Sequence, residues 1–246
     1  MTSAQREPGG APCRNVSNGP VLALLPSPLL GPTVWRPVAE VLRARGWDAL
    51  SCPVAGRTPQ EVLDCFAAAL TAGRDVALVP HSNAGAYVPA LCSRLPVVAT
   101  VFVDAVLAPA SGTVPLAPPA LLADLRGRTD GHGDLPVWTS WWEDADVAPL
   151  FPDATIRALV EADQRRLPLS YFESSLPVPQ GWDQRPGAYL AFGDTYADER
   201  AAAARRGWPV RTIQGRHLHM LIDPVGVADE LVRLMNTVCP GRSSGP

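Results

Sequence analysis

The chain has 246 residues, of which 18% are charged, and its formal net charge is −3 at pH 7. This length allows one large domain with a sizeable core, and the low charge argues against nucleic acid as a partner. All 21 basic residues are arginine, which excludes catalysis by a lysine amine, as in Schiff-base or Ser-Lys enzymes.

The five cysteines are widely spaced and form no C-x-x-C pair, a pattern typical of reduced thiols in a cytoplasmic protein. Residues 1–20 and 239–246 are polar and rich in Gly and Pro, so we expect two disordered tails without a signal peptide. No stretch reaches the ~18 apolar residues of a membrane span. We therefore expect a cytoplasmic protein without a membrane partner, and the sequence leaves its oligomeric state open.

Short apolar runs alternate with helical patterns along the chain. The predicted strands are residues 21–25, 48–52, 76–79, 97–103, 188–192 and 209–213. The predicted helices are residues 34–45, 58–72, 84–95, 198–206 and 223–238. Thr58 to Glu61 has the pattern of a capping box, and Pro89 is expected to kink the third helix. This alternation predicts an α/β fold with a doubly wound, mostly parallel sheet, whose ligands bind at the carboxyl ends of the strands.

Residues 107–186 interrupt the alternation. They are rich in proline and aromatic residues, with a helix expected to begin near Asp153, and we interpret them as a cap or lid over a pocket at the strand ends. The core then consists of residues 21–106 and 187–238. The candidate substrate-binding residues of the cap are Trp138, Trp141, Trp142 and Tyr171. The alternative is that these rings only pack the insertion onto the sheet.

Ser82 lies where a predicted strand passes into a predicted helix, in the segment Pro80-His81-Ser82-Asn83-Ala84. Such a turn exposes the serine hydroxyl, and small residues on either side let the two backbones pass closely, as in the G-x-S-x-G nucleophile elbow. Here Pro80 and Ala84 replace the two glycines, and Gly85 follows. The alternative is that Ser82 only caps the helix.

A serine hydroxyl needs a base to attack an ester, and the base needs a third group to orient it. His81 adjoins Ser82 and is expected to point elsewhere, while His132 lies in the insertion. His217 and His219 follow the last predicted strand and should therefore lie level with Ser82 at the same edge of the sheet.

The elbow, the strand end Phe102-Val-Asp104 and the late segment from Gly215 to Pro224 occur in an order that resembles the α/β-hydrolase superfamily. The resemblance covers residues 21–238 and implies an α/β-hydrolase fold of about six strands with a cap insertion. It also implies that Ser82 is the nucleophile and His217 the general base, with His219 as the second choice. A metal site formed by His217, His219 and Asp223 would need a further ligand, so no metal is expected.

The same resemblance implies that the acid of the triad follows one of two strands. Asp104 follows the strand after the nucleophile, and Asp194 follows the next one. The spacing usual for the second position falls on Tyr196, which cannot orient an imidazole as a carboxylate does. Asp104 is therefore preferred to Asp194, with Asp198 third, and the alternative for Asp104 is a buried carboxylate that binds the backbone of the cap.

Two backbone N–H groups are expected to form the oxyanion hole. One is that of Asn83, at the dipole-favoured start of its helix. The family's second donor comes from the loop after the first strand, and alignment on Trp35 puts Pro28 at that position. Because proline has no N–H, either Leu29 takes this role or the hole is incomplete.

The sequence thus predicts a serine hydrolase of esterase or thioesterase type, which cleaves an ester, thioester or lactone of a mid-sized apolar small molecule. The catalytic residues would be Ser82, His217 and Asp104, or Asp194 in place of Asp104. The alternatives are a non-hydrolytic lyase or cyclase that uses the same pocket, and a catalytically silent ligand-binding module. No cofactor is expected, since the sequence has no glycine-rich phosphate loop and no cluster of metal ligands.

Overall fold

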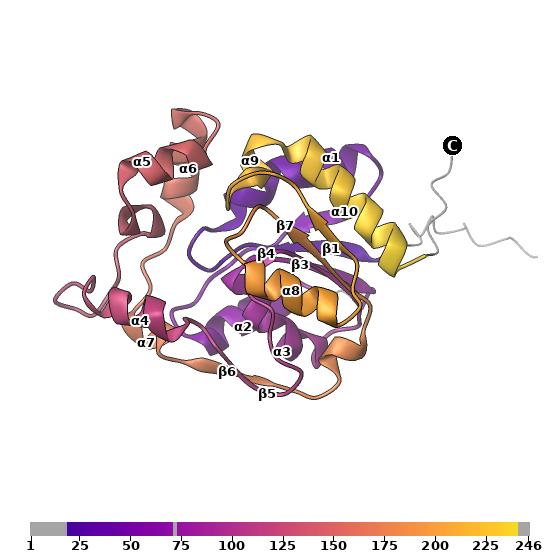
Figure 1. Ribbon diagram of the computed structural model, residues 1–246, viewed down its shortest axis with the longest axis horizontal. Coiled ribbons are helices and arrows are strands. Elements are labelled where there is room, and N and C mark those ends of the chain that lie inside the picture. Colours follow the sequence, from indigo (N-terminus) through magenta and orange to yellow (C-terminus); the bar gives the residue numbers. More distant parts are fainter. Residues whose placement is uncertain (1–18, 71–72, 241–246) are drawn as a thin grey trace, which may run out of the picture.

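The structure is a computed structural model that describes residues 19–70 and 73–240 (Figure 1). The predicted tails therefore lie outside the described residues, apart from residues 19–20 and 239–240. Within the described ranges, no helix has the length and apolar character needed to cross a membrane.

The core is a six-stranded sheet in the order β2-β1-β3-β4-β7-β8, and all its neighbouring strands are parallel. The strands are β1 (Val21–Leu25), β2 (Ala49–Ser51), β3 (Val76–Ser82), β4 (Val97–Ala105), β7 (Gly187–Ala191) and β8 (Val210–Thr212). Each corresponds to a predicted strand, and the doubly wound parallel sheet is confirmed.

Helices cover both faces of this sheet (Figure 1). The residues of β1 alternate between the faces, so that Leu22 and Leu24 join one core cluster while Ala23 and Leu25 join the other. The first cluster is closed by α1 (Arg36–Ala44) and α10 (Pro224–Val238), and the second by α2 (Pro59–Ala69), α3 (Val88–Cys92) and α8 (Ala197–Arg205). The remaining short helices of the core are η1 (Pro32–Trp35), η2 (Asn83–Tyr87) and α9 (His219–Ile222).

Two helix starts agree with the predicted caps. Thr58 and Glu61 form the capping box of α2, with each side chain accepting a 3.2 Å bond from the other's backbone N–H. The carboxylate of Asp223 accepts a 2.9 Å bond from Gly226 N–H at the start of α10.

The prediction of a single kinked helix after Ser82 is wrong, since the chain forms the 3-10 helix η2 and then α3. Pro89 lies in the first turn of α3, where its missing N–H leaves no helical bond unmade.

The insertion of residues 107–186 has more regular structure than its composition predicts. Its elements are β5 (Gly112–Pro115), α4 (Pro119–Arg126), η3 (Trp138–Trp141), α5 (Asp144–Val147), η4 (Ala148–Leu150), α6 (Ala154–Asp163), α7 (Leu169–Phe172), β6 (Ser175–Val178) and η5 (Trp182–Gln184). The antiparallel pair β5 and β6 was not predicted, because each strand is short and contains a proline, Pro115 or Pro177. In Figure 1, α4 to α7 gather at one side of the sheet, and β5 and β6 run beneath α3.

Candidate active site

Ser82 ends β3 in a strained backbone conformation, with φ 57° and ψ −128°. Among the described residues, Ser82 and Asp104 (φ 42°) are the two non-glycine residues with positive φ. Such strain is costly and persists only where the surrounding structure enforces it, often at functional sites. The Ser82 turn therefore has the backbone geometry expected of a nucleophile elbow.

The close backbone approach beyond the elbow falls on Gly85. A Cβ atom at this position would lie 2.0 Å from the carbonyl oxygen of Val106, which follows β4. Ala84, where the sequence motif has its second glycine, is fully buried within the core. The position that requires glycine is therefore Gly85, one residue after the second glycine of the sequence motif.

Asp104 and His217 are in direct contact. His217 Nδ1 lies 2.6 Å from Asp104 Oδ2, and the second carboxylate oxygen of Asp104 accepts a 3.2 Å bond from Phe192 N–H. Asp104 is fully buried at the end of β4. When Nδ1 of His217 donates to this carboxylate, its Nε2 keeps a lone pair that can accept a proton.

The other two carboxylates considered from the sequence lie away from His217. The side chain of Asp194 is 87% exposed and pairs with Arg200 at 3.0 Å. Asp198 is exposed in the first turn of α8. Of the three candidates, Asp104 alone is bonded to the imidazole.

His81 lies behind His217 rather than away from it. Its Nε2 donates a 2.9 Å bond to the main-chain carbonyl of His217, and the two ring centroids are 4.5 Å apart. Burial, reinforced by the neighbouring His217, lowers the pKa of His81 well below its ordinary value. His81 is therefore a neutral ring that supports the loop of the proposed base, a contact that sequence adjacency to Ser82 did not reveal.

The Ser82 hydroxyl is bonded to Tyr196. The two oxygen atoms are 3.2 Å apart, and in the described part of the chain Ser82 Oγ has no other hydrogen-bond partner. The Tyr196 ring also lies beside that of His217, with 5.7 Å between centroids. The phenol of Tyr196 keeps its proton at neutral pH, since its ordinary pKa is about 10 and burial raises that pKa further. The sequence identifies Tyr196 only as the residue that replaces a carboxylate at the second position expected for the acid.

The side chain of Asn83 joins the elbow to the insertion. Its Nδ2 donates to the carbonyl of Leu116 at 2.8 Å, and its Oδ1 accepts a 2.8 Å bond from the hydroxyl of Tyr171. The Tyr171 hydroxyl is also 2.7 Å from that of Tyr87. Tyr171 is thus a buried residue that holds Asn83, and the backbone N–H of Asn83 lies at the start of η2, where helical N–H groups lack intrahelical partners.

The loop after β1 offers a weaker second donor. Pro28 has no N–H, and the N–H of Leu29 points to Ser27 Oγ at 3.4 Å, which is long for a hydrogen bond. The Leu29 side chain is buried in the core. The Leu29 N–H is therefore directed toward Ser27 in its own loop rather than left free for an oxyanion.

The three tryptophans of the insertion have three different environments. The half-buried ring of Trp138 lies 6.0 Å from the His217 ring, centroid to centroid. Trp141 is buried against Phe172, while Trp142 is 46% exposed. Only Trp138 of these three contacts the site.

His219 does not share the surroundings of His217. Its ring packs edge-on against Phe192 at 5.6 Å, and Asp223 caps α10. Within residues 19–70 and 73–240, no group of three or more His, Cys, Asp or Glu residues is arranged to hold a metal ion.

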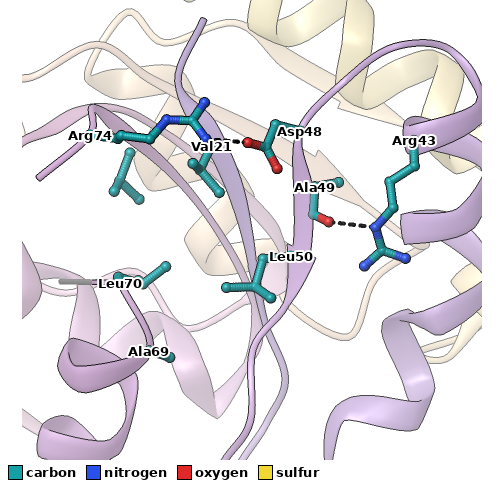
Figure 2. A pocket seen from close by; sticks show the side chains of 9 residues that line it. Val21, Arg43, Asp48, Ala49, Leu50, Ala69, Leu70 and Arg74 are labelled. Carbon is teal, nitrogen blue, oxygen red and sulfur yellow. Dashed lines mark hydrogen bonds and ion pairs between the residues drawn. The ribbon is translucent and has the colours of Figure 1, made fainter. Parts of the chain in front are cut away.

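A cavity of about 290 Å³ lies at the amino ends of strands β1 and β3, opposite to the end that carries Ser82 (Figure 2). Val21 and Val76, which begin β1 and β3, line it, whereas Ser82 ends β3. Figure 2 shows the guanidinium group of Arg74 directed toward the carboxylate of Asp48, with which it forms an ion pair. This cavity is therefore separate from the site around Ser82.

No protein-family profile matches the chain, and no curated protein matches its sequence. Several solved structures resemble it. An extracellular α/β-hydrolase from a Paenibacillus species is 18% identical with a TM-score of 0.69, covering 92% of this chain and 100% of its own. A pyrethroid hydrolase is 18% identical with a TM-score of 0.68, covering 90% and 99%.

A third similar structure is tomato methylketone synthase I, solved with 2-tridecanone. It is 14% identical with a TM-score of 0.69, and the match covers 89% of this chain and 98% of the synthase. These likenesses span almost the whole length of each protein. The chain has the α/β-hydrolase fold, as its sequence predicts.

Proposed function

We propose that this protein is a serine hydrolase that cleaves a carboxylic ester of a mid-sized apolar small molecule, with thioesters and lactones as related substrates. The observation that supports this most is the 2.6 Å contact between His217 Nδ1 and Asp104 Oδ2, beside a serine in a strained elbow. A nucleophile, a base and a buried carboxylate that orients the base are the elements of a catalytic triad.

In the proposed mechanism, the Ser82 hydroxyl rotates from Tyr196 to His217 and attacks the ester carbonyl. His217 Nε2 takes the hydroxyl proton and passes it to the leaving alcohol, while Asp104 stabilises the imidazolium. Water then attacks the acyl-enzyme with His217 as base. The backbone N–H of Asn83 donates to the oxyanion in both steps.

The surroundings of His217 support an apolar substrate. Trp138 is a large ring next to the proposed base, and an aromatic ring offers apolar surface to a substrate. The proposal needs no cofactor. The described cysteines, Cys52, Cys65, Cys92 and Cys239, are free thiols, which fits the cytoplasmic location expected from the sequence.

The test is hydrolysis of a series of p-nitrophenyl esters of increasing acyl length, followed by labelling with a fluorophosphonate probe and mapping of the labelled residue. Ser82→Ala should abolish both turnover and labelling. Ser93→Ala is the matched control, since it removes an exposed serine whose hydroxyl bonds, among the described residues, only to the Pro89 carbonyl. Turnover by Ser82→Ala at a rate near wild type would contradict the proposal.

One observation favours a second function. The Ser82 hydroxyl is bonded to Tyr196 rather than to His217, and a protein of the same fold is a methylketone synthase. In a lyase or cyclase reaction His217 would transfer protons to and from the substrate without an acyl-enzyme. Adding His217→Ala to the comparison separates the two functions, because the second function predicts that His217→Ala is inactive while Ser82→Ala retains turnover.

A further inference from the structure

Tyr196 stands where the turn after β7 points into the site. Gly193, at φ 89°, redirects the chain after β7, and Tyr196 then occupies the position before α8. Its hydroxyl lies 3.2 Å from Ser82 Oγ, and its ring lies against that of His217. A group in hydrogen-bond contact with the nucleophile can also reach an oxygen bonded to the carbon that the nucleophile attacks.

The backbone leaves the oxyanion hole short of one donor. Asn83 supplies an N–H, but Pro28 has none, and the Leu29 N–H is directed at Ser27 Oγ. Serine hydrolases bind the transition-state oxyanion with preorganised donors, and loss of one costs about 10²- to 10³-fold in rate. A donor from elsewhere in the fold would supply the missing stabilisation.

We propose that the Tyr196 hydroxyl is this second oxyanion donor, an inference that rests on the proposed hydrolase function. Tyr196 keeps its proton at neutral pH, because the ordinary pKa of a phenol is about 10 and desolvation raises it further, so it can donate a hydrogen bond and cannot act as the base. Its contact with His217 fixes the ring and limits the reorganisation needed during the reaction.

Ser82 Oγ forms a bond to the acyl carbon, its proton moves to His217 Nε2, and the π electrons of the carbonyl move onto the carbonyl oxygen. Released from its hydrogen bond with the serine hydroxyl, the Tyr196 O–H donates to this oxyanion and keeps its own proton. When the carbonyl reforms, the C–O bond to the alcohol breaks, and the leaving oxygen takes the proton from His217.

Two other roles for Tyr196 predict a different effect of its removal on the rate. If the phenol only held the Ser82 hydroxyl away from His217, its removal would free the nucleophile and leave the rate equal or higher. If the ring only packed against His217, phenylalanine would replace it without loss, since the two rings have the same shape.

The experiment compares wild type, Tyr196→Phe and Tyr87→Phe on a p-nitrophenyl ester and on a trifluoromethyl ketone, which forms a hemiketal anion with an active serine. Tyr87→Phe also removes a buried hydroxyl, but it leaves the Tyr171 bond to Asn83 in place. For Tyr196→Phe we expect kcat to fall about a hundredfold or more with KM little changed. The inhibition constant of the ketone should rise by a similar factor.

The outcomes separate this inference from the proposed function. If wild type hydrolyses the ester, Ser82→Ala does not, and Tyr196→Phe matches wild type, then the Tyr196 role is wrong and the hydrolase function stands. A fall in kcat with unchanged affinity for the ketone would also reject an oxyanion role. If wild type neither hydrolyses the esters nor binds the ketone, the hydrolase function itself is rejected, and the Tyr196 role with it.

Discussion

The imidazole of His81 donates a 2.9 Å hydrogen bond to the main-chain carbonyl of His217, and the two rings lie 4.5 Å apart. His81 is fully buried, and its Nδ1 has no hydrogen-bond partner within the described structure. The loop that carries His217 is thus supported from behind by a ring that has no partner to stabilise a positive charge. We therefore expect the fold to be sensitive to acid.

Stability should fall as pH drops below about 6.5, the ordinary pKa of histidine. The pKa of His81 is lowered in the folded state, so the unfolded chain binds a proton there that the native chain does not. The contribution of His81 to the free energy of unfolding is therefore present above pH 6.5 and is lost below it, by at most about 1.4 kcal/mol per pH unit. Urea unfolding at pH 7.5 and 5.5 measures this loss.

His81→Gln keeps a side-chain donor but cannot titrate, so its stability should depend less on pH than that of wild type. His132→Gln removes an exposed histidine and serves as the control. An equal pH dependence in wild type and His81→Gln would show that another group causes the acid sensitivity.

Asp104→Asn should lower kcat by about 10⁴-fold, the effect known for a triad whose amide selects the wrong histidine tautomer. Asp194→Asn should change kcat little, because this carboxylate faces solvent and pairs with Arg200. Steady-state kinetics of both variants on one p-nitrophenyl ester makes the comparison. Comparable losses in the two variants would be inconsistent with a single acid at Asp104.

Trp138→Ala should raise KM for a long-chain ester about tenfold, equal to about 1.4 kcal/mol of lost apolar contact, and affect an acetyl ester less. The reason is that the ring beside His217 offers binding surface rather than chemistry. Trp142→Ala removes an exposed ring and is the control. Equal changes for both esters would mean that Trp138 does not select the acyl chain.

Gly85→Ala should lower the free energy of unfolding by about 1–3 kcal/mol or more, because its Cβ would overlap the Val106 carbonyl. Gly131→Ala is the matched control, since a Cβ there meets nothing within 4 Å. Thermal melting of the two variants measures the difference. A melting temperature of Gly85→Ala equal to that of Gly131→Ala would contradict the close approach at the elbow.

The sheet could be predicted from the sequence because strands buried on both faces form continuous apolar runs, as at residues 76–79 and 97–103. The 3-10 start after Ser82 could not, because it depends on the backbone approach between Gly85 and Val106. The pair β5 and β6 was missed because its strands contain prolines and pair only with each other.

The site was predictable as a set of residues but not as a set of contacts. Asp104 and Asp194 both follow strands at the same edge, so chain order alone could not decide between them. Two local features distinguish these carboxylates in the structure. Asp104 has a positive φ and its carboxylate contacts His217, whereas the carboxylate of Asp194 is exposed and pairs with Arg200. The bond from Ser82 to Tyr196 joins residues 114 positions apart and has no signature in either segment.

Ser82 and Asp104 lie at the ends of β3 and β4, which are hydrogen-bonded neighbours in the middle of the sheet. The carboxylate bonded to His217 therefore does not come from the turn after β7. For protein engineering, this separates the Tyr196 position from the acid of the triad. A library at Tyr196 would vary the group that faces the nucleophile, while the imidazole keeps its orienting bond from a strand that the library does not touch.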